Sequence, residues 1–298
     1  MQALILAGGR GMRLNPLANE VPIPLLHLPG GTILDYSLHQ ISQLKIDRVA
    51  LILQYRGDQI ARYLADQHDE PFTLIPQYAP FTFLSALASA APWVEEPTLV
   101  VHGNCYFSNS LSHLVQESDP ATPSFLLCPE DVEQERIGAA GAYLLPPEIF
   151  YLAARLVEKD SLAVLHSAMR AEKWGLQALP MQGWARSINT ATDLLMVNRY
   201  LLTHWHEIAH PPGAGVGYDA LNFSWISPKA EVGSKVSSLF VTVGPGASVE
   251  GSYLYNSLLL PGVHIHDTKE QHAILARSAH SLLRLYVPAT ATASVGCG

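Results

Sequence analysis

The chain has 298 residues, of which 48% are hydrophobic, and this length suits one large α/β domain with a smaller second one. Its 26 acidic and 18 basic residues give a net charge of −8 without long runs of one sign, which argues against nucleic-acid binding. No window approaches the roughly 18 apolar residues that cross a bilayer, and the first residues lack the basic segment of a secretion signal. We therefore expect a soluble protein without a nucleic-acid or membrane partner.

The cysteines indicate a reducing compartment. Cys105, Cys128 and Cys297 are odd in number, widely spaced and outside any C-x-x-C arrangement. This pattern fits free thiols better than disulfides or a zinc site. We therefore expect a cytoplasmic protein.

In the first 200 residues, short β-rich apolar runs alternate with segments of helical period, which predicts a sheet flanked by helices. Apolar residues recur at helical spacing from Ile33 to Leu44, from Ile60 to Leu64 and from Leu194 to Leu202. The predicted strands are 2–6, 48–53, 73–76, 98–102, 123–127 and 141–145.

The C-terminal part follows a different period. Residues 211–217, rich in Pro and Gly, read as a linker after a first domain at 1–212. Beyond it, six residues separate Ile226 from Val232 and Val243 from Val249, and small alanines follow four residues after the first of each pair. This hexapeptide spacing predicts a parallel β-helix at 213–288, followed by a flexible tail at 289–298.

A glycine-rich loop, Leu6 to Leu14, directly follows the first predicted strand. Its glycines let backbone N–H groups approach an anion closely, and Arg13 adds a guanidinium suited to phosphate. Taken alone, the loop fits a tight turn without ligand equally well.

The loop is the first of several segments that occur in a recognisable order. This succession resembles the sugar-1-phosphate nucleotidyltransferases, or nucleotide-sugar pyrophosphorylases. The resemblance implies a Rossmann-like sheet flanked by helices and a short left-handed parallel β-helix, which several subgroups carry at the C-terminus. The segments are Leu6 to Leu14, Asn15 to Leu17, Glu20 to Leu26, Ile33 to Leu38, Gln77 to Leu87, Leu99 to Asn104, Ala140 to Tyr143 and Trp184 to Arg199.

The resemblance also implies a nucleotide site. Members of this family hold a nucleoside triphosphate over the glycine loop, and a sugar phosphate attacks its α-phosphorus while pyrophosphate leaves with magnesium. Gln77 matches the glutamine that reads the base. The positions that match the triphosphate loop are Ala7, Gly8, Gly9, Gly11 and Arg13. A nucleotide or sugar-nucleotide ligand is therefore expected here.

Three positions depart from the family pattern. The lysine that contacts the sugar phosphate falls on Ile23, and the two magnesium-binding aspartates fall on Asn104 and Ser187. None of these supplies the charge that the chemistry requires, and each such loss costs several kcal/mol, roughly a hundredfold or more in rate. We therefore expect no metal site and no cofactor, with Mg²⁺ needed only if the chain is active after all.

Two further departures affect the substrate pockets. The small-residue turn beside the base reads Phe81-Thr82-Phe83-Leu84, and the bulk of Phe83 would narrow that pocket. Between Cys128 and Gly141, only Pro129 to Arg136 stands where the family has a strand pair with a sugar-contacting Glu-Lys-Pro. Both changes point to a reduced sugar and base site.

These observations predict a noncatalytic relative of the family with a regulatory or scaffolding role. The alternative is an active nucleotidyltransferase, making a nucleotide-sugar with replaced metal ligands. A short β-helix exposes strand edges at its ends, so we expect a homo-oligomer, or a hetero-oligomer with an active relative. The contact is expected around residues 239–243 and 253–260.

Two histidine clusters raise other possibilities. His206 and His210 match H-E-x-x-H, the pattern of a helical zinc site, and His204 lies nearby. Pro211 and Pro212 end any helix there and no third ligand is identifiable, so cationic side chains at a helix end explain this cluster better. In the predicted β-helix, His264, His266, Asp267 and His272 suit a hexapeptide-repeat acyltransferase, whose histidine deprotonates an acceptor. A solvated or packed histidine pair fits this short tail better.

Overall fold

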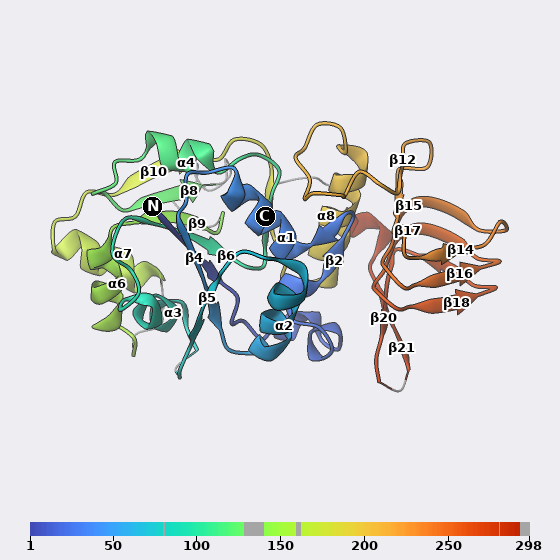
Figure 1. The fold of residues 1–298 in the computed structure, drawn as a ribbon, viewed down its shortest axis with the longest axis horizontal. Helices are drawn as coiled ribbons and strands as arrows, with labels where there is room; N and C mark the ends of the chain where they lie inside the picture. The colour runs from blue at the N-terminus through green and yellow to red at the C-terminus, as the bar shows by residue number, and fades with distance from the viewer. Residues whose placement is uncertain (80, 128–139, 159–161, 280, 293–298) are drawn as a thin grey trace. The chain divides into compact units, whose positions relative to one another are not determined.

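A computed structural model gives the fold of the chain and describes residues 1–79, 81–127, 140–158, 162–279 and 281–292 (Figure 1). The chain divides into two compact units that interleave in sequence. Within the described residues, unit 1 comprises residues 1–10 and 40–185, and unit 2 comprises residues 11–39 and 186–292. These units cut across the linear division expected at residue 212, which stays a prediction.

Unit 1 is built on a mixed sheet whose strands lie in the order β10-β8-β9-β6-β1-β4-β5. Strand β1 pairs in parallel with β4 and β6, and β4 pairs in parallel with β5. Strand β9 runs antiparallel to both β6 and β8, and β10 is parallel to β8. The strands are β1 (Gln2–Leu6), β4 (Arg48–Leu53), β5 (Thr73–Pro76), β6 (Thr98–His102), β8 (Ser124–Leu127), β9 (Ala142–Leu145) and β10 (Gln177–Pro180).

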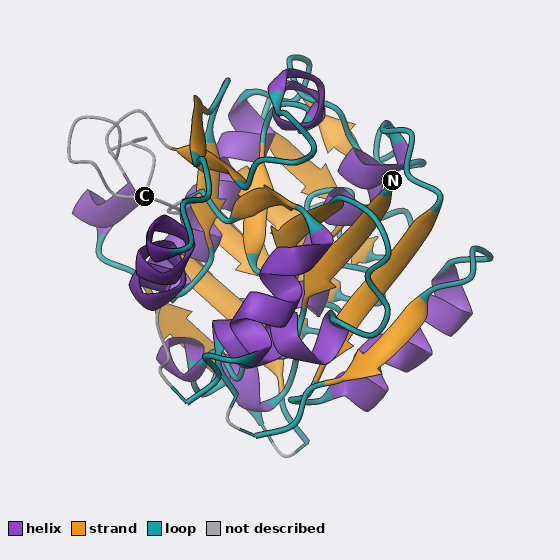
Figure 2. Cartoon of the chain, turned by 90° about the vertical axis from the view of Figure 1, so that its left-hand side faces the viewer, coloured by secondary structure: helices purple, strands orange, loops and turns teal. Residues whose placement is uncertain are grey.

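Helices flank this sheet, as the alternating pattern of the sequence predicts (Figure 2). Side chains from β1, β4, β6 and β9 form a buried core with apolar residues of α3, α6 and α7. The remaining elements of unit 1 are α2 (Gly57–Gln67), α3 (Phe83–Ala90), β7 (Cys105–Phe107), α4 (Ser112–Glu117), α6 (Pro147–Ala154) and α7 (Leu162–Ala171). Of the helices in the described residues, none combines the length and the apolar character that crossing a membrane requires.

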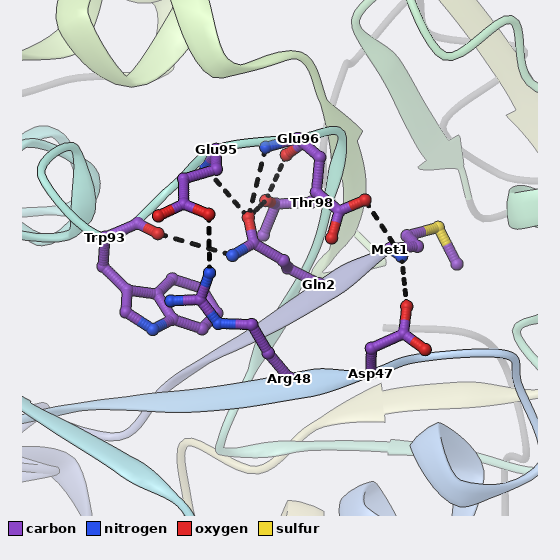
Figure 3. A network of polar contacts seen from close by, with 8 residues as sticks. All are labelled: Met1, Gln2, Asp47, Arg48, Trp93, Glu95, Glu96 and Thr98. Carbon is purple, nitrogen blue, oxygen red and sulfur yellow. Dashed lines mark hydrogen bonds and ion pairs between the residues drawn. The ribbon is translucent and has the colours of Figure 1, made fainter.

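A polar network holds the amino ends of the three parallel strands together (Figure 3). Gln2 is fully buried, and its side-chain oxygen accepts hydrogen bonds from the backbone of Glu95 and Glu96. The amino terminus of Met1 lies 2.8 Å from an Asp47 carboxylate oxygen. Because Gln2 pairs in register with Arg48, the network fixes β1 against its neighbour.

Unit 2 combines helix α8 (Ala191–Thr203) with a set of short strands. Helix α1 (Ile33–Ser42) and strand β11 (Ala185–Ser187) carry the chain across the unit boundaries. The strands of unit 2 are β2 (His27–Leu28), β3 (Gly31–Thr32), β12 (Tyr218–Asp219), β13 (Ser224–Ile226), β14 (Glu231–Val232), β15 (Ser237–Val243), β16 (Ser248–Glu250), β17 (Tyr253–Leu259), β18 (His264–His266), β19 (Lys269–Gln271), β20 (Ala273–Arg277) and β21 (Leu282–Tyr286).

The C-terminal strands stack as successive parallel turns of one coil (Figure 1). Partner residues are 17 positions apart in the first turn, as in Trp225 with Thr242, and 16 apart in the next, as in Ser237 with Tyr253. Backbone corners with positive φ recur at the same interval: Phe240, Asn256 and His272 form one series. This arrangement is compatible with the expected parallel β-helix, while its left-handedness stays a prediction.

The end of the coil is covered by the chain itself. Strand β21 folds back antiparallel to β20, so the parallel ladder stops there. The side chain of Glu270, 3% exposed, accepts hydrogen bonds from Arg284 Nε and the Tyr286 hydroxyl, both at 2.9 Å. This buried carboxylate is therefore paired, as its location in the coil interior requires.

We predict that shortening an interior side chain of the coil destabilises the protein strongly. Leu259 is fully buried in the coil core, so Leu259→Ala should lower the free energy of unfolding by about 2 to 5 kcal/mol. Leu221 is 90% exposed, and the matched change Leu221→Ala should stay within about 0.5 kcal/mol of the wild type. Urea denaturation followed by circular dichroism measures both; equal losses would contradict the placement of Leu259 in a packed interior.

Candidate functional site

The glycine loop begins at the carboxyl edge of the unit 1 sheet. The Ala7 N–H donates to the Ile52 carbonyl at 3.0 Å, so it continues the ladder and is unavailable to a phosphate. A Cβ on Gly8 would lie 2.8 Å from Gln77 Oε1, whereas one on Gly9 would meet nothing within 4 Å. Gly8 is therefore required for close packing, and Gly9 faces open space.

The next part of the loop lies in unit 2, where it meets Ile23, the position at which the family has a lysine. Gly11 has φ +62°, and a Cβ there would come within 2.8 Å of Ile23 Cγ1. Ile23 is only 6% exposed, so its side chain packs against the glycine. Arg13, in the turn Met12–Leu14, is exposed and has no ion-pair partner among the described residues.

The side-chain amide of Gln77 uses its N–H donors in hydrogen bonds within the protein. Its amide nitrogen donates to the Thr82 carbonyl and to Ser85 Oγ, both at 2.8 Å. Because a carbonyl oxygen only accepts, the nitrogen must face Thr82, and the amide presents only its oxygen toward Gly8. Thr82 and Ser85 also form the capping box that begins α3. Gln77 thus holds the turn whose sequence was expected to line the base pocket.

An aromatic cluster lies beside that turn. The ring of Phe83 packs at 5.6 Å from His102 and 5.5 Å from Tyr143, which themselves are 5.5 Å apart. His102 ends β6, and its buried Nε2 has no hydrogen-bond partner in the described part of the chain. Burial lowers the pKa of His102 from 6.5 to about 4, so the ring is neutral at physiological pH. The bulk of Phe83 is evident from the sequence, whereas no sequence pattern points to His102.

The two positions of the family aspartates carry neutral side chains in half-buried settings. Asn104 follows β6, and the Cys105 thiol lies 4.0 Å from its side-chain oxygen. Ser187 ends β11, and the carboxylate nearest to it in sequence is that of Asp193. This carboxylate is already engaged, because Arg186 and the Thr190 hydroxyl both donate to it.

These residues do not fit a magnesium site. A hard divalent cation prefers anionic oxygen ligands, which neither Asn104 nor Ser187 provides. Across residues 1–79, 81–127, 140–158, 162–279 and 281–292, no group of three or more His, Cys, Asp and Glu residues is arranged to hold a metal ion. The segment Pro129 to Arg136, expected to replace the sugar-contacting strand pair, lies outside the described residues, as do Cys128 and Cys297.

The structure does not support a helical zinc site at His206 and His210. Helix α8 ends at Thr203, so the two histidines do not lie on one helix face. Both ring nitrogens of His210 already make contacts, with the Trp205 carbonyl at 2.7 Å and the Tyr36 hydroxyl at 3.1 Å. His204 stacks on Tyr200, with ring centroids 4.2 Å apart.

The histidines of the coil lie on its outer surface. His264 Nδ1 is 2.6 Å from Ser248 Oγ, one turn earlier in the coil. His266 is 84% exposed, 3.7 Å from Asp267. His272, at a corner of the coil, contacts the Asn256 side chain at 2.9 Å. Each of these histidines therefore contacts a nearby residue of the coil. The three do not converge on one point, as a catalytic site for acyl transfer would require.

Comparison with known proteins identifies the N-terminal fold. The sequence model of the nucleotidyl transferase family matches residues 2–136. The bifunctional protein GlmU of Methanocaldococcus jannaschii is 22% identical over 227 residues, covering 68% of this chain. The UTP–glucose-1-phosphate uridylyltransferase AglF of Haloferax volcanii is 26% identical over 144 residues, 47% of this chain. The chain spans about half the length of these relatives, 54% and 58% respectively.

Among solved structures, the fold is similar to that of a Bacillus anthracis protein in complex with a sucrose, assigned as a glucose-1-phosphate thymidylyltransferase. The TM-score is 0.56, with 67% of this chain and 94% of that one covered. At 19% sequence identity this likeness establishes the fold alone.

We predict that His102 makes the protein sensitive to acid. The pKa of His102 falls from 6.5 in the unfolded chain to about 4 in the folded one, so the unfolded state binds the proton more readily. Its contribution to stability is complete above about pH 6.5 and is lost as the pH falls toward 4, by on the order of 2 kcal/mol.

His102→Phe keeps a ring in the cluster and removes the titration. Urea denaturation at a series of pH values should therefore show a smaller acid-induced loss of stability in this variant than in the wild type. The exposed His266→Phe serves as the control and should retain the wild-type loss. Parallel pH profiles for wild type and His102→Phe would contradict the assignment.

Proposed function

Because the sequence model of the nucleotidyl transferase family matches residues 2–136, we propose that this chain is a noncatalytic relative of the sugar-phosphate nucleotidyltransferases, with a regulatory or scaffolding role. The packing of Ile23 against Gly11 is the observation that carries this proposal. It occurs at the position where the family resemblance places the lysine for the sugar phosphate.

The surroundings of Ile23 are adapted to an apolar side chain. A Cβ on Gly11 would meet Ile23 Cγ1 at 2.8 Å and the methyl group of Ala18 at 3.4 Å, so two apolar side chains lie beside this glycine. An ammonium group in the same place would lose its hydration without gaining an anionic partner, at a cost of several kcal/mol. The packing beside Gly11 therefore suits an isoleucine at position 23 and not a lysine.

The two aspartate positions support the same proposal. Nucleotidyl transfer depends on neutralising phosphate charge, and Asn104 and Ser187 bring no charge to the reaction. The carboxylate of Asp193 does not substitute for them, because its ion pair with Arg186 and its helix-capping bonds already occupy both oxygens. Catalysis by this chain alone would lack three of the groups that the family uses.

Weak anion binding remains compatible with the loop. Arg13 is exposed, and Gly9 faces open space. We infer that a nucleotide or sugar nucleotide binds there through its phosphates, without help from a metal ion. The amide oxygen of Gln77 is then the part of that side chain left to contact a base.

A scaffolding role requires an interaction surface, for which unit 2 offers limited candidates. Val241, Val243, Leu254 and Leu259 are buried inside the coil, so they cannot form the intermolecular contact expected around residues 239–243 and 253–260. Leu239 and Tyr253 remain, at 37% and 43% exposure. Self-association or pairing with an active relative stays a prediction, which light scattering would test.

We predict no detectable pyrophosphate release from any nucleoside triphosphate mixed with common sugar 1-phosphates and Mg²⁺. A coupled pyrophosphate assay measures this, with an active family member as the positive control. Turnover on the order of 1 per second or faster would establish the active alternative instead. The triple variant Ile23→Lys/Asn104→Asp/Ser187→Asp should also stay inactive, because the lysine would enter a packed apolar position.

We also predict weak nucleotide binding that does not depend on Mg²⁺, with a dissociation constant of about 0.1 mM or weaker. Isothermal titration calorimetry with and without Mg²⁺ measures it. Arg13→Ala should weaken binding by about tenfold, because a charge-assisted hydrogen bond to phosphate is lost. Arg62→Ala, which removes an exposed guanidinium of α2, should leave the affinity unchanged. If Arg13→Ala changes nothing, the nucleotide binds elsewhere.

A further inference from the structure

Two histidines stand on the same outward face of one strand of the coil. Strand β18 consists of His264, Ile265 and His266, and it lies in a three-stranded parallel sheet with β14 and β16 (Figure 1). Ile265 is 6% exposed and packs in the coil interior, whereas both histidines are exposed. Because alternate residues of a strand share a face, the two imidazoles project outward about 6.6 Å apart along the strand. We call His264 and His266 the histidine pair.

In both members of the histidine pair, Nδ1 lies near an oxygen atom of a neighbouring residue. His264 Nδ1 is 2.6 Å from Ser248 Oγ, and His266 Nδ1 is 3.7 Å from a carboxylate oxygen of Asp267. In the described part of the chain, neither Nε2 has a hydrogen-bond partner. A ring that donates its Nδ1 proton to such an oxygen carries its lone pair on Nε2.

This arrangement is typical of histidines that bind metal ions. A metal-ligating imidazole generally donates its other ring N–H to a carboxylate or another oxygen acceptor, which fixes the ring and makes the ligating nitrogen more basic. Ser248 provides such an oxygen for His264, and Asp267 provides a negative charge beside His266. The lone pairs available to a ligand are therefore the two Nε2 lone pairs, on one face of one strand.

The charge of the surrounding sheet favours a cation. Glu250 on β16 pairs in register with His266, and Glu231 lies on β14 of the same sheet. Both glutamates and Asp267 are exposed. None of β14, β16 and β18 contains Lys or Arg, and the two lysines nearest to β14 in the chain lie in the turns before and after it. Three carboxylates near the histidine pair therefore raise the local concentration of cations.

We propose that the histidine pair binds one divalent transition-metal ion through the Nε2 atoms of His264 and His266. Imidazole nitrogen is a preferred ligand of Cu²⁺, Ni²⁺ and Zn²⁺, whereas Mg²⁺ prefers oxygen. Two protein ligands are fewer than the three that no group among the described residues brings together, so water fills the remaining positions. The ion is then exposed and exchangeable. This site is independent of nucleotide binding by the glycine loop.

Isothermal titration calorimetry of Ni²⁺ into the untagged full chain at about pH 7.5, where free imidazole is largely neutral, tests the proposal. We expect one ion per chain. His264→Gln and His266→Gln should each weaken binding at least about tenfold, because one imidazole alone cannot chelate the ion. Both side chains are exposed, so these variants should fold. The control His206→Gln changes an exposed histidine of the H-E-x-x-H motif and should retain the wild-type affinity.

Electron paramagnetic resonance with Cu²⁺ identifies the ligands directly. The wild type should show nitrogen hyperfine coupling from two imidazoles, and each single variant of the histidine pair should show one fewer. Unchanged affinity in both His264→Gln and His266→Gln would overturn the proposal. Loss of binding in His206→Gln instead, a spectrum without imidazole coupling, or no binding of Ni²⁺ at about 0.1 mM would overturn it as well.

Discussion

The arrangement of unit 1 depends on the parallel register of β1 with the strands on either side. Gln2 stands opposite Arg48 on β4 and Thr98 on β6, and its buried amide bonds to the segment that leads into β6. Once the amino ends are aligned, the carboxyl ends are aligned as well, because parallel strands rise equally per residue. The residues that follow these strands therefore meet at one edge, where open α/β sheets bind their ligands.

Several side chains in the segments that the family resemblance singles out make contacts within the protein. The amide of Gln77 supports a helix cap, His102 lies among aromatic rings, and Ile23 closes over Gly11. Each arrangement is an internal contact that contributes to stability. If the chain is noncatalytic as proposed, restoring one side chain does not recover activity, because its neighbours pack against the residue that stands there now.

The sequence predicted the strands well and the chemistry of the edge only in part. Strands 2–6, 48–53 and 98–102 occur as expected, since buried parallel strands are short apolar runs between turn residues. Strand 73–76 also occurs as expected, as a largely exposed strand at the edge of the sheet. The interleaving of the units follows from long-range packing, which no local pattern encodes. The hydrogen bonds of Gln77 to Thr82 and Ser85 and the contact of His210 with Tyr36 likewise depend on residues that only the fold brings together.

The coil of unit 2 also constrains how its length can change. Its interior residues are spaced six, five and five apart, as Val243, Val249, Leu254 and Leu259 show, so one turn takes 16 residues. The first turn takes 17 residues, so a single extra residue is accommodated there. A longer insertion within a turn would rotate later side chains out of the interior, whereas a whole added turn would preserve every register. Duplication and deletion in this region are therefore tolerated in units of a full turn, and the antiparallel hairpin of β20 and β21 marks the point beyond which the coil cannot grow.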